Sequence, residues 1–114
     1  MEVKGNNYHV IYNPTTATVI LQGTLRLRGL AEYDPIIQLL NDVVGQKPET
    51  ITLDLQQLRF LNSSGINILF RFVINVREQA ASKLFVRGSS QIPWQQKSLI
   101  NLQRLMAGAQ LELV

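Results

Sequence analysis

The stretch Leu53-Asp54-Leu55, continuing to Phe60-Leu61-Asn62-Ser63-Ser64-Gly65-Ile66, carries most of the structural information in this chain of 114 residues. Apolar residues alternate with polar ones up to Leu55, which predicts a β-strand with one buried face. Helical spacing of apolar residues begins at Ile66 and continues to about Arg77, so the serines lie where a helix begins. The first N–H groups of a helix lack intrahelical partners and favour negative charge. The stretch therefore predicts a strand–loop–helix unit that presents a hydroxyl at a place suited to a phosphate.

Composition narrows the class of protein. The length predicts one domain, residues 1–114, with a real hydrophobic core. The net charge of +3 comes from dispersed basic residues, which argues against nucleic acid as a partner. The absence of cysteine excludes disulfides and thiolate metal sites. No apolar run approaches the roughly 20 residues of a membrane span, and the first residues lack the apolar segment of a signal peptide. We therefore expect a cytoplasmic protein without membrane insertion.

The rest of the chain alternates between strand and helix patterns. Segments 8–12 and 17–22 predict an antiparallel hairpin, and Asp34-Pro35 reads as the N-cap and first position of a helix that ends at Gly45. The later elements follow as strand 51–55, the helix from Ile66, strand 84–86, the helix from Pro93 and strand 111–114. The predicted fold is α/β, in the order ββαβαβαβ, with helices packed on a mixed, mostly parallel sheet. The outer edge of strand 8–12 is expected to be exposed and able to pair in a weak homodimer.

The helix after the serines has a polar stripe. At 100° per residue one sector contains Ser64, Asn67, Arg71, Asn75 and Glu78. The opposite sector is apolar and should face the sheet; its members are Ile66, Leu69, Val73 and Val76. Apolar residues also flank the stripe: Ile68 and Phe72 on one side, Phe70 and Ile74 on the other. One interpretation is a protein-docking surface bordered by apolar side chains; the other is a helix buried over most of its circumference.

Enzymatic chemistry finds little support in the sequence. His9 is the only histidine, and no acidic partner is implied for it. The glycines are scattered, so no glycine-rich phosphate loop is present. No carboxylate pair or metal-ligand spacing appears. We expect a protein that is not an enzyme and that needs no cofactor or metal.

The central stretch resembles the signature of STAS domains, specifically the bacterial anti-sigma factor antagonists. The resemblance lies in Asp54-Leu55-x-x-Leu58-x-Phe60-Leu61-Asn62-Ser63-Ser64-Gly65-Ile66, where the family has an Asp-Leu strand and then Asp-Ser-Ser/Thr-Gly-Leu opening a helix. Gly23-Thr24-Leu25 and Leu84-Phe85-Val86 occupy matching places along the chain. Asn62 and Arg26 stand where the family carries acidic residues, which indicates a divergent branch.

The resemblance implies a switch in signal transduction and transcription regulation. In that family the unphosphorylated domain binds a serine kinase that is also an anti-sigma factor, the kinase phosphorylates the second residue of the serine pair, and a PP2C-type phosphatase reverses the step. By position the acceptor here is Ser64, with Ser63 as the alternative. The expected partner-binding residues are Asn62, Ser63, Gly65, Asn67, Ile68, Arg71 and Phe72.

Three other interpretations remain open. The serines are also typical helix caps. The chain also fits a STAS scaffold that is not phosphorylated, or a domain that senses a nucleotide or lipid.

Overall fold

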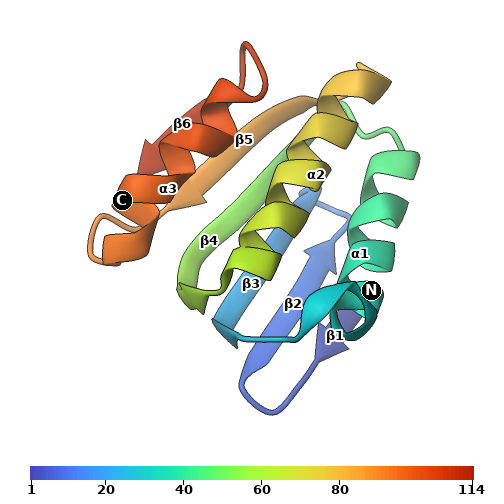
Figure 1. Ribbon diagram of the computed structural model, residues 1–114. Coiled ribbons are helices and arrows are strands. Elements are labelled where there is room, and N and C mark those ends of the chain that lie inside the picture. The colour runs from blue at the N-terminus through green and yellow to red at the C-terminus, as the bar shows by residue number, and fades with distance from the viewer.

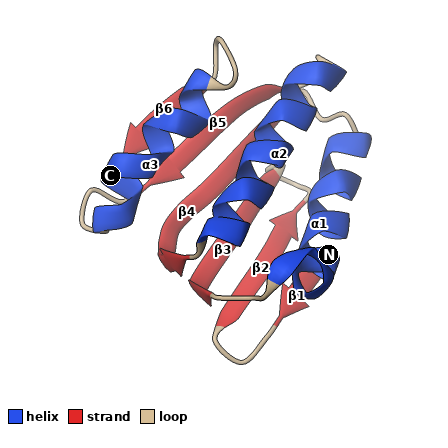
Figure 2. Ribbon diagram, viewed as in Figure 1, coloured by secondary structure: helices blue, strands red, loops and turns tan.

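A computed structural model describes residues 1–114 and shows one six-stranded sheet with three helices, all on the same face (Figures 1 and 2). The strands are β1 (Glu2–Lys4), β2 (Tyr8–Asn13), β3 (Thr18–Leu25), β4 (Thr50–Leu61), β5 (Lys83–Gly88) and β6 (Gln110–Leu113). The helices are α1 (Gly29–Gly45), α2 (Ser63–Gln79) and α3 (Pro93–Arg104). The strands lie in the sheet in the order in which they occur in the chain.

The first three strands pair antiparallel, whereas β3 to β6 pair parallel. Each parallel pair is joined by one helix, and consecutive right-handed crossovers in the same direction place all three helices on one face. This confirms the α/β prediction of a mixed, mostly parallel sheet with an N-terminal antiparallel hairpin.

Two predictions about the N-terminal half are wrong. Residues 2–4 form an additional strand, β1, which pairs with β2 and covers the edge that we expected to be exposed. Helix α1 begins at Gly29, not at Asp34, and contains Pro35 in its interior. Tyr33 continues the buried helical spacing of Ile36 and Leu40 toward the N-terminus, and its burial outweighs the hydrogen bond that Pro35 cannot donate.

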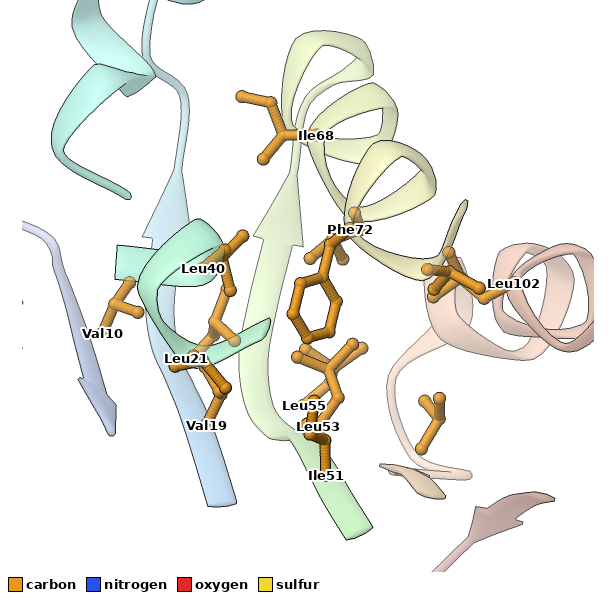
Figure 3. Packing of buried hydrophobic residues seen from close by; sticks show 14 of the residues in the cluster. Val10, Val19, Leu21, Leu40, Ile51, Leu53, Leu55, Ile68, Phe72 and Leu102 are labelled. Carbon is orange, nitrogen blue, oxygen red and sulfur yellow. The ribbon is translucent and has the colours of Figure 1, made fainter. Parts of the chain in front are cut away.

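The core lies between the sheet and the helices. The central strands contribute Val19, Leu21, Leu53 and Leu55 from their helix-facing side, each at most 1% exposed. Figure 3 shows the ring of Phe72 directed from α2 toward Leu53 and Leu55. The apolar residues that predicted strand β4 thus point into this core, and the polar residues between them point to the helix-free face of the sheet.

Strand β4 is longer than predicted and carries two register shifts against β3, the first between Ile20 and Gln22 and the second between Gly23 and Thr24. Its pairing with β5 stops at Asp54. Beyond that point Gln95, at the start of α3, donates from Nε2 to the carbonyls of Leu55 (2.6 Å) and Leu58 (3.0 Å). A buried side-chain amide thus satisfies two carbonyls on the edge that β5 no longer covers, while pairing with β3 continues to Leu61 and carries β4 to the residue before Asn62.

Candidate functional site

The serine pair lies directly after β4, where α2 begins, at the same end of the sheet as the carboxyl end of β3 (Figure 1). Asn62 is the N-cap residue of α2, and its Oδ1 accepts the N–H of Gly65 at 2.9 Å. Ser63 and Ser64 are the first two helical residues, and no acidic residue occupies the first turn. Because Asn62 supplies the cap, the serine hydroxyls are not needed for it.

Asn62 points into the protein. Besides capping Gly65, its Oδ1 accepts a hydrogen bond from Tyr33 Oη at 2.7 Å, and its Nδ2 donates to the carbonyl of Leu27 at 2.8 Å. Its backbone N–H donates to Leu25 O at 3.1 Å. The side chain of Asn62 thereby connects the start of α2 with the segment before α1 and with α1 itself, and its backbone adds a connection to β3. This residue has a structural role, and its polar atoms are not offered to a partner.

Tyr33 was not among the residues singled out in the sequence. Its side chain is 1% exposed, and burial raises the pKa of the Tyr33 phenol, so it stays a neutral hydrogen-bond donor at physiological pH. The helical spacing of Tyr33 with Ile36 and Leu40 was the available signal, but Pro35 obscured it.

Gly65 is buried and holds the helix start close to the sheet. A Cβ at this position would overlap the side chain of Leu61 and would lie 2.7 Å from Tyr33 Oη. Any larger residue would therefore push α2 away from β4 and disturb the Tyr33–Asn62 contact. The glycine that follows the serine pair serves close packing here, and this side of the residue is not available to a partner.

Ile68 and Phe72, which flank the polar stripe, are almost fully buried. They are 4% and 3% exposed, because α1 packs alongside α2 and Phe72 inserts toward the sheet. On this side the interpretation of a largely buried helix is correct. Both residues still line the inside of a groove of about 370 Å³ between the two helices, together with Ile37 and Asn41 of α1.

The remaining predicted residues lie at the surface. Ser63, Asn67 and Arg71 are exposed, and Ser64 is half-buried. We call Ser63, Ser64, Asn67 and Arg71 the serine face. It runs from the N-terminus of α2 along the solvent side of its first turns, with free backbone N–H groups at one end and a guanidinium at the other. The serine face is thus a polar surface with a positive electrostatic character.

Few other features suggest chemistry. No group of three His, Asp or Glu side chains is placed to hold a metal ion, and no helix is long and apolar enough to cross a membrane. Trp94 donates from Nε1 to Leu58 O at 3.0 Å and is half-buried, so it supports the end of β4.

Comparison with known proteins identifies the fold. No protein-family model matches the chain, and no curated protein matches it in sequence. Among solved structures, SiaC of Pseudomonas aeruginosa is similar with a TM-score of 0.76 and 11% identity, over 100% of this chain and 96% of that one. The crystal structure of the diguanylate cyclase SiaD in complex with its activator SiaC, from the same organism, contains a chain with the same TM-score and identity, covered to 99%.

An anti-sigma factor antagonist from Mycobacterium paratuberculosis has a TM-score of 0.67 and 16% identity, over 94% of this chain and 86% of that one. At such identities the likeness establishes a common fold. The chain therefore has a divergent STAS-like fold, as its central sequence predicted.

Proposed function

We propose that this protein is a regulatory module that binds a protein partner through its serine face, and that phosphorylation of Ser64 switches the binding off. A partner serine kinase would add the phosphate and a PP2C-type phosphatase would remove it. One observation carries the proposal: Asn62, and not a serine, caps α2. The hydroxyls of Ser63 and Ser64 are therefore free.

The local physical chemistry supports a phosphate here. A phosphoserine carries about −1.5 to −2 charges near pH 7. The N–H groups of Gly65 and Ile66 are bonded to Asn62, whereas those of Ser63 and Ser64 have no partner within the helix, and no carboxylate lies in the first turn. The added charge would change the serine face from positive to negative without disturbing the core. Binding to a partner would then be lost through repulsion and desolvation, while the fold stays intact.

The similar structures support a regulatory role. SiaC is named as the activator of a diguanylate cyclase, and the mycobacterial protein as an antagonist of an anti-sigma factor; both names describe control of another protein. The alternative is a constitutive scaffold that binds its partner through the same serine face but is never phosphorylated. The experiment must distinguish this scaffold from a phosphorylation switch.

The Asn62 substitution fits this proposal. The polar atoms of Asn62 are turned toward Tyr33 and Leu27. An amide in place of the family's carboxylate therefore changes the hydrogen bonds beneath the loop, and the residues of the serine face are unaffected.

The test combines a kinase assay with a binding assay. The protein is incubated with ATP and the serine kinase encoded nearest to its gene, and intact mass is compared for wild type, Ser64→Ala and Ser63→Ala. We expect one phosphate on wild type and on Ser63→Ala, and none on Ser64→Ala. Pull-down of the kinase should succeed with Ser64→Ala and fail with Ser64→Glu. Phosphate on Ser64→Ala at the wild-type level would contradict the assignment, and binding without any phosphate transfer would favour the scaffold.

A further inference from the structure

A second polar site lies on the helix-free face of the sheet, at the end where β3 and β4 finish. A hollow of about 910 Å³ is bounded there by the β1–β2 connection, by the end of β3 and by β4. Its polar lining includes Asn6, Asn7, Thr24, Arg26, Gln57 and Arg59. Figure 1 shows the β1–β2 connection at the same end of the molecule as the carboxyl ends of β3 and β4. The hollow is separate from the groove between α1 and α2.

The charged residues that line the hollow are all positive. Arg26 and Arg59 both line it, and no carboxylate does. Neither guanidinium takes part in an ion pair, whereas Arg87 pairs with Glu112 at 3.2 Å on the same sheet. In a chain whose net charge is only +3, two unpaired arginines around one hollow form a local concentration of positive charge. Such an arrangement attracts an anion.

The hollow is preformed. The guanidinium of Arg26 stacks over the Phe60 ring at 4.5 Å from its centroid, which limits the rotamers of this long side chain and leaves its N–H edges free. The opposite wall is held by a hydrogen bond from Thr24 N to Asn7 O at 2.8 Å. Gly23 permits this close approach, since it has a φ of +89° and a Cβ there would overlap Asn7 O. Preorganised donors lose less entropy when a ligand binds.

We propose that this hollow binds a small phosphate-bearing anion. The forks of Arg26 and Arg59 suit the oxygens of a phosphate group, because guanidinium binds phosphate with paired hydrogen bonds. The side-chain amides of Asn6, Asn7 and Gln57 supply further donors. Only two of the ten lining residues are hydrophobic, so the ligand is polar over most of its surface. The phosphate can belong to a free metabolite or to a lipid headgroup.

Calorimetric titration of the full chain at low salt tests this site with three probes: ATP, inorganic pyrophosphate, and vesicles of phosphatidylglycerol. The variants are Arg26→Gln and Arg59→Gln, with Arg104→Gln as the matched control, because Arg104 lies in the last turn of α3 and its loss changes the net charge equally. We expect each hollow variant to weaken binding of at least one probe about tenfold, and the control to weaken it less than twofold. Thermal melting of each variant checks that it is folded.

The three probes identify the source of the phosphate. Binding of ATP or pyrophosphate that depends on both arginines supports a soluble ligand, and ATP alone would show that the nucleoside is also recognised. Vesicle binding alone, with the same dependence, supports a lipid headgroup. No binding of any probe, or an equal loss in Arg104→Gln, would overturn the proposal. None of these readouts requires the kinase or Ser64, so failure here leaves the proposed switch untouched.

Discussion

Tyr33 donates a hydrogen bond from its phenol to Oδ1 of Asn62 at 2.7 Å, and this contact ties the first turns of α1 to the first turn of α2. The same oxygen accepts Gly65 N, and the amide nitrogen of Asn62 donates to Leu27 O. All polar atoms of one half-buried side chain are therefore satisfied inside the protein. The serine pair is therefore held in place by residues that lie beneath it.

Replacing Asn62 should destabilise the protein more than a surface change in the same helix. Asn62→Ala removes a helix cap and leaves Tyr33 Oη and Leu27 O without partners. We expect a loss of about 2–4 kcal/mol in the free energy of unfolding, from about 1 kcal/mol for the cap and 1–3 for the unsatisfied groups. Asn62→Asp keeps both acceptor contacts but faces Leu27 O with an oxygen, so we expect about 1 kcal/mol. Urea denaturation measures both.

Asn67 provides the matched control for these changes. It is exposed on the same helix, and we expect Asn67→Ala and Asn67→Asp to change the free energy of unfolding by less than about 0.5 kcal/mol. Equal effects at positions 62 and 67 would contradict the inward role of Asn62.

Tyr33 makes stability depend on pH in the alkaline range. Burial raises its pKa above the ordinary value near 10 that applies to the unfolded chain. Above pH 10 the unfolded state loses this proton while the folded state keeps it, so stability falls as the pH rises toward the folded-state pKa. The slope cannot be steeper than the one-proton limit of about −1.4 kcal/mol per pH unit. Below pH 10 the contribution is constant.

Tyr33→Phe isolates that effect. This variant should lose about 1 kcal/mol at pH 7, because one hydrogen bond disappears. The difference between wild type and Tyr33→Phe, measured by urea denaturation from pH 7 to 11, should be flat up to about pH 10 and then shrink. A constant difference across the whole range would show that the phenol titrates alike in both states.

Much of the fold was predictable because the relevant signals are local. Alternation in 51–55 and helical spacing after Ile66 each report a buried face directly. The short strand β1 lacks such a pattern: its three residues form a strand because β2 offers an edge. Helix α1 began earlier than predicted because Pro35, usually a helix breaker, is accommodated once Tyr33 is buried.

The burial of the residues that flank the polar stripe could not be predicted, for a different reason. The helical period of α2 shows which residues share a side, but it does not show whether a neighbouring helix covers that side. Packing of α1 against α2 buries Ile68 and Phe72, and only the tertiary arrangement reveals this. The same holds for Tyr33 and Arg59, whose partners or surroundings come from distant parts of the chain.

Gly65→Ala should destabilise the protein although alanine favours helices. The added methyl group would meet Leu61 and Tyr33 Oη, and overpacking of this kind costs about 1–3 kcal/mol. Gly45→Ala is the control, since Gly45 ends α1 and nothing lies within 4 Å of an added Cβ. We expect Gly45→Ala to be neutral or to stabilise by up to about 1 kcal/mol. Thermal denaturation compares the two variants. Equal changes in melting temperature would argue against close packing of Gly65 at the start of α2.

Gln95 should be among the residues most sensitive to substitution. It is fully buried and bonds to Leu55 O, Leu58 O and Ser89 N. Gln95→Ala leaves Leu55 O and Ser89 N without this partner, whereas Leu58 O keeps the hydrogen bond from Trp94 Nε1. We expect a loss of about 2–4 kcal/mol. The exposed neighbour Gln96→Ala should cost less than about 1 kcal/mol. Urea denaturation decides, and a small effect at Gln95 would mean that water takes over its hydrogen bonds.

A negative charge at Ser64 should stabilise the isolated protein even where it abolishes partner binding. Ser64→Asp places a carboxylate beside the free N–H groups of the first turn of α2, and we expect a gain of about 0.3–1 kcal/mol at low salt that shrinks in 1 M NaCl. Gln79→Glu places the same charge at the last residue of that helix and should have the opposite sign. Thermal melts at both salt concentrations measure the pair. If Ser64→Asp instead unfolds the protein, phosphorylation would act by disrupting the fold, and the proposed surface mechanism would be wrong.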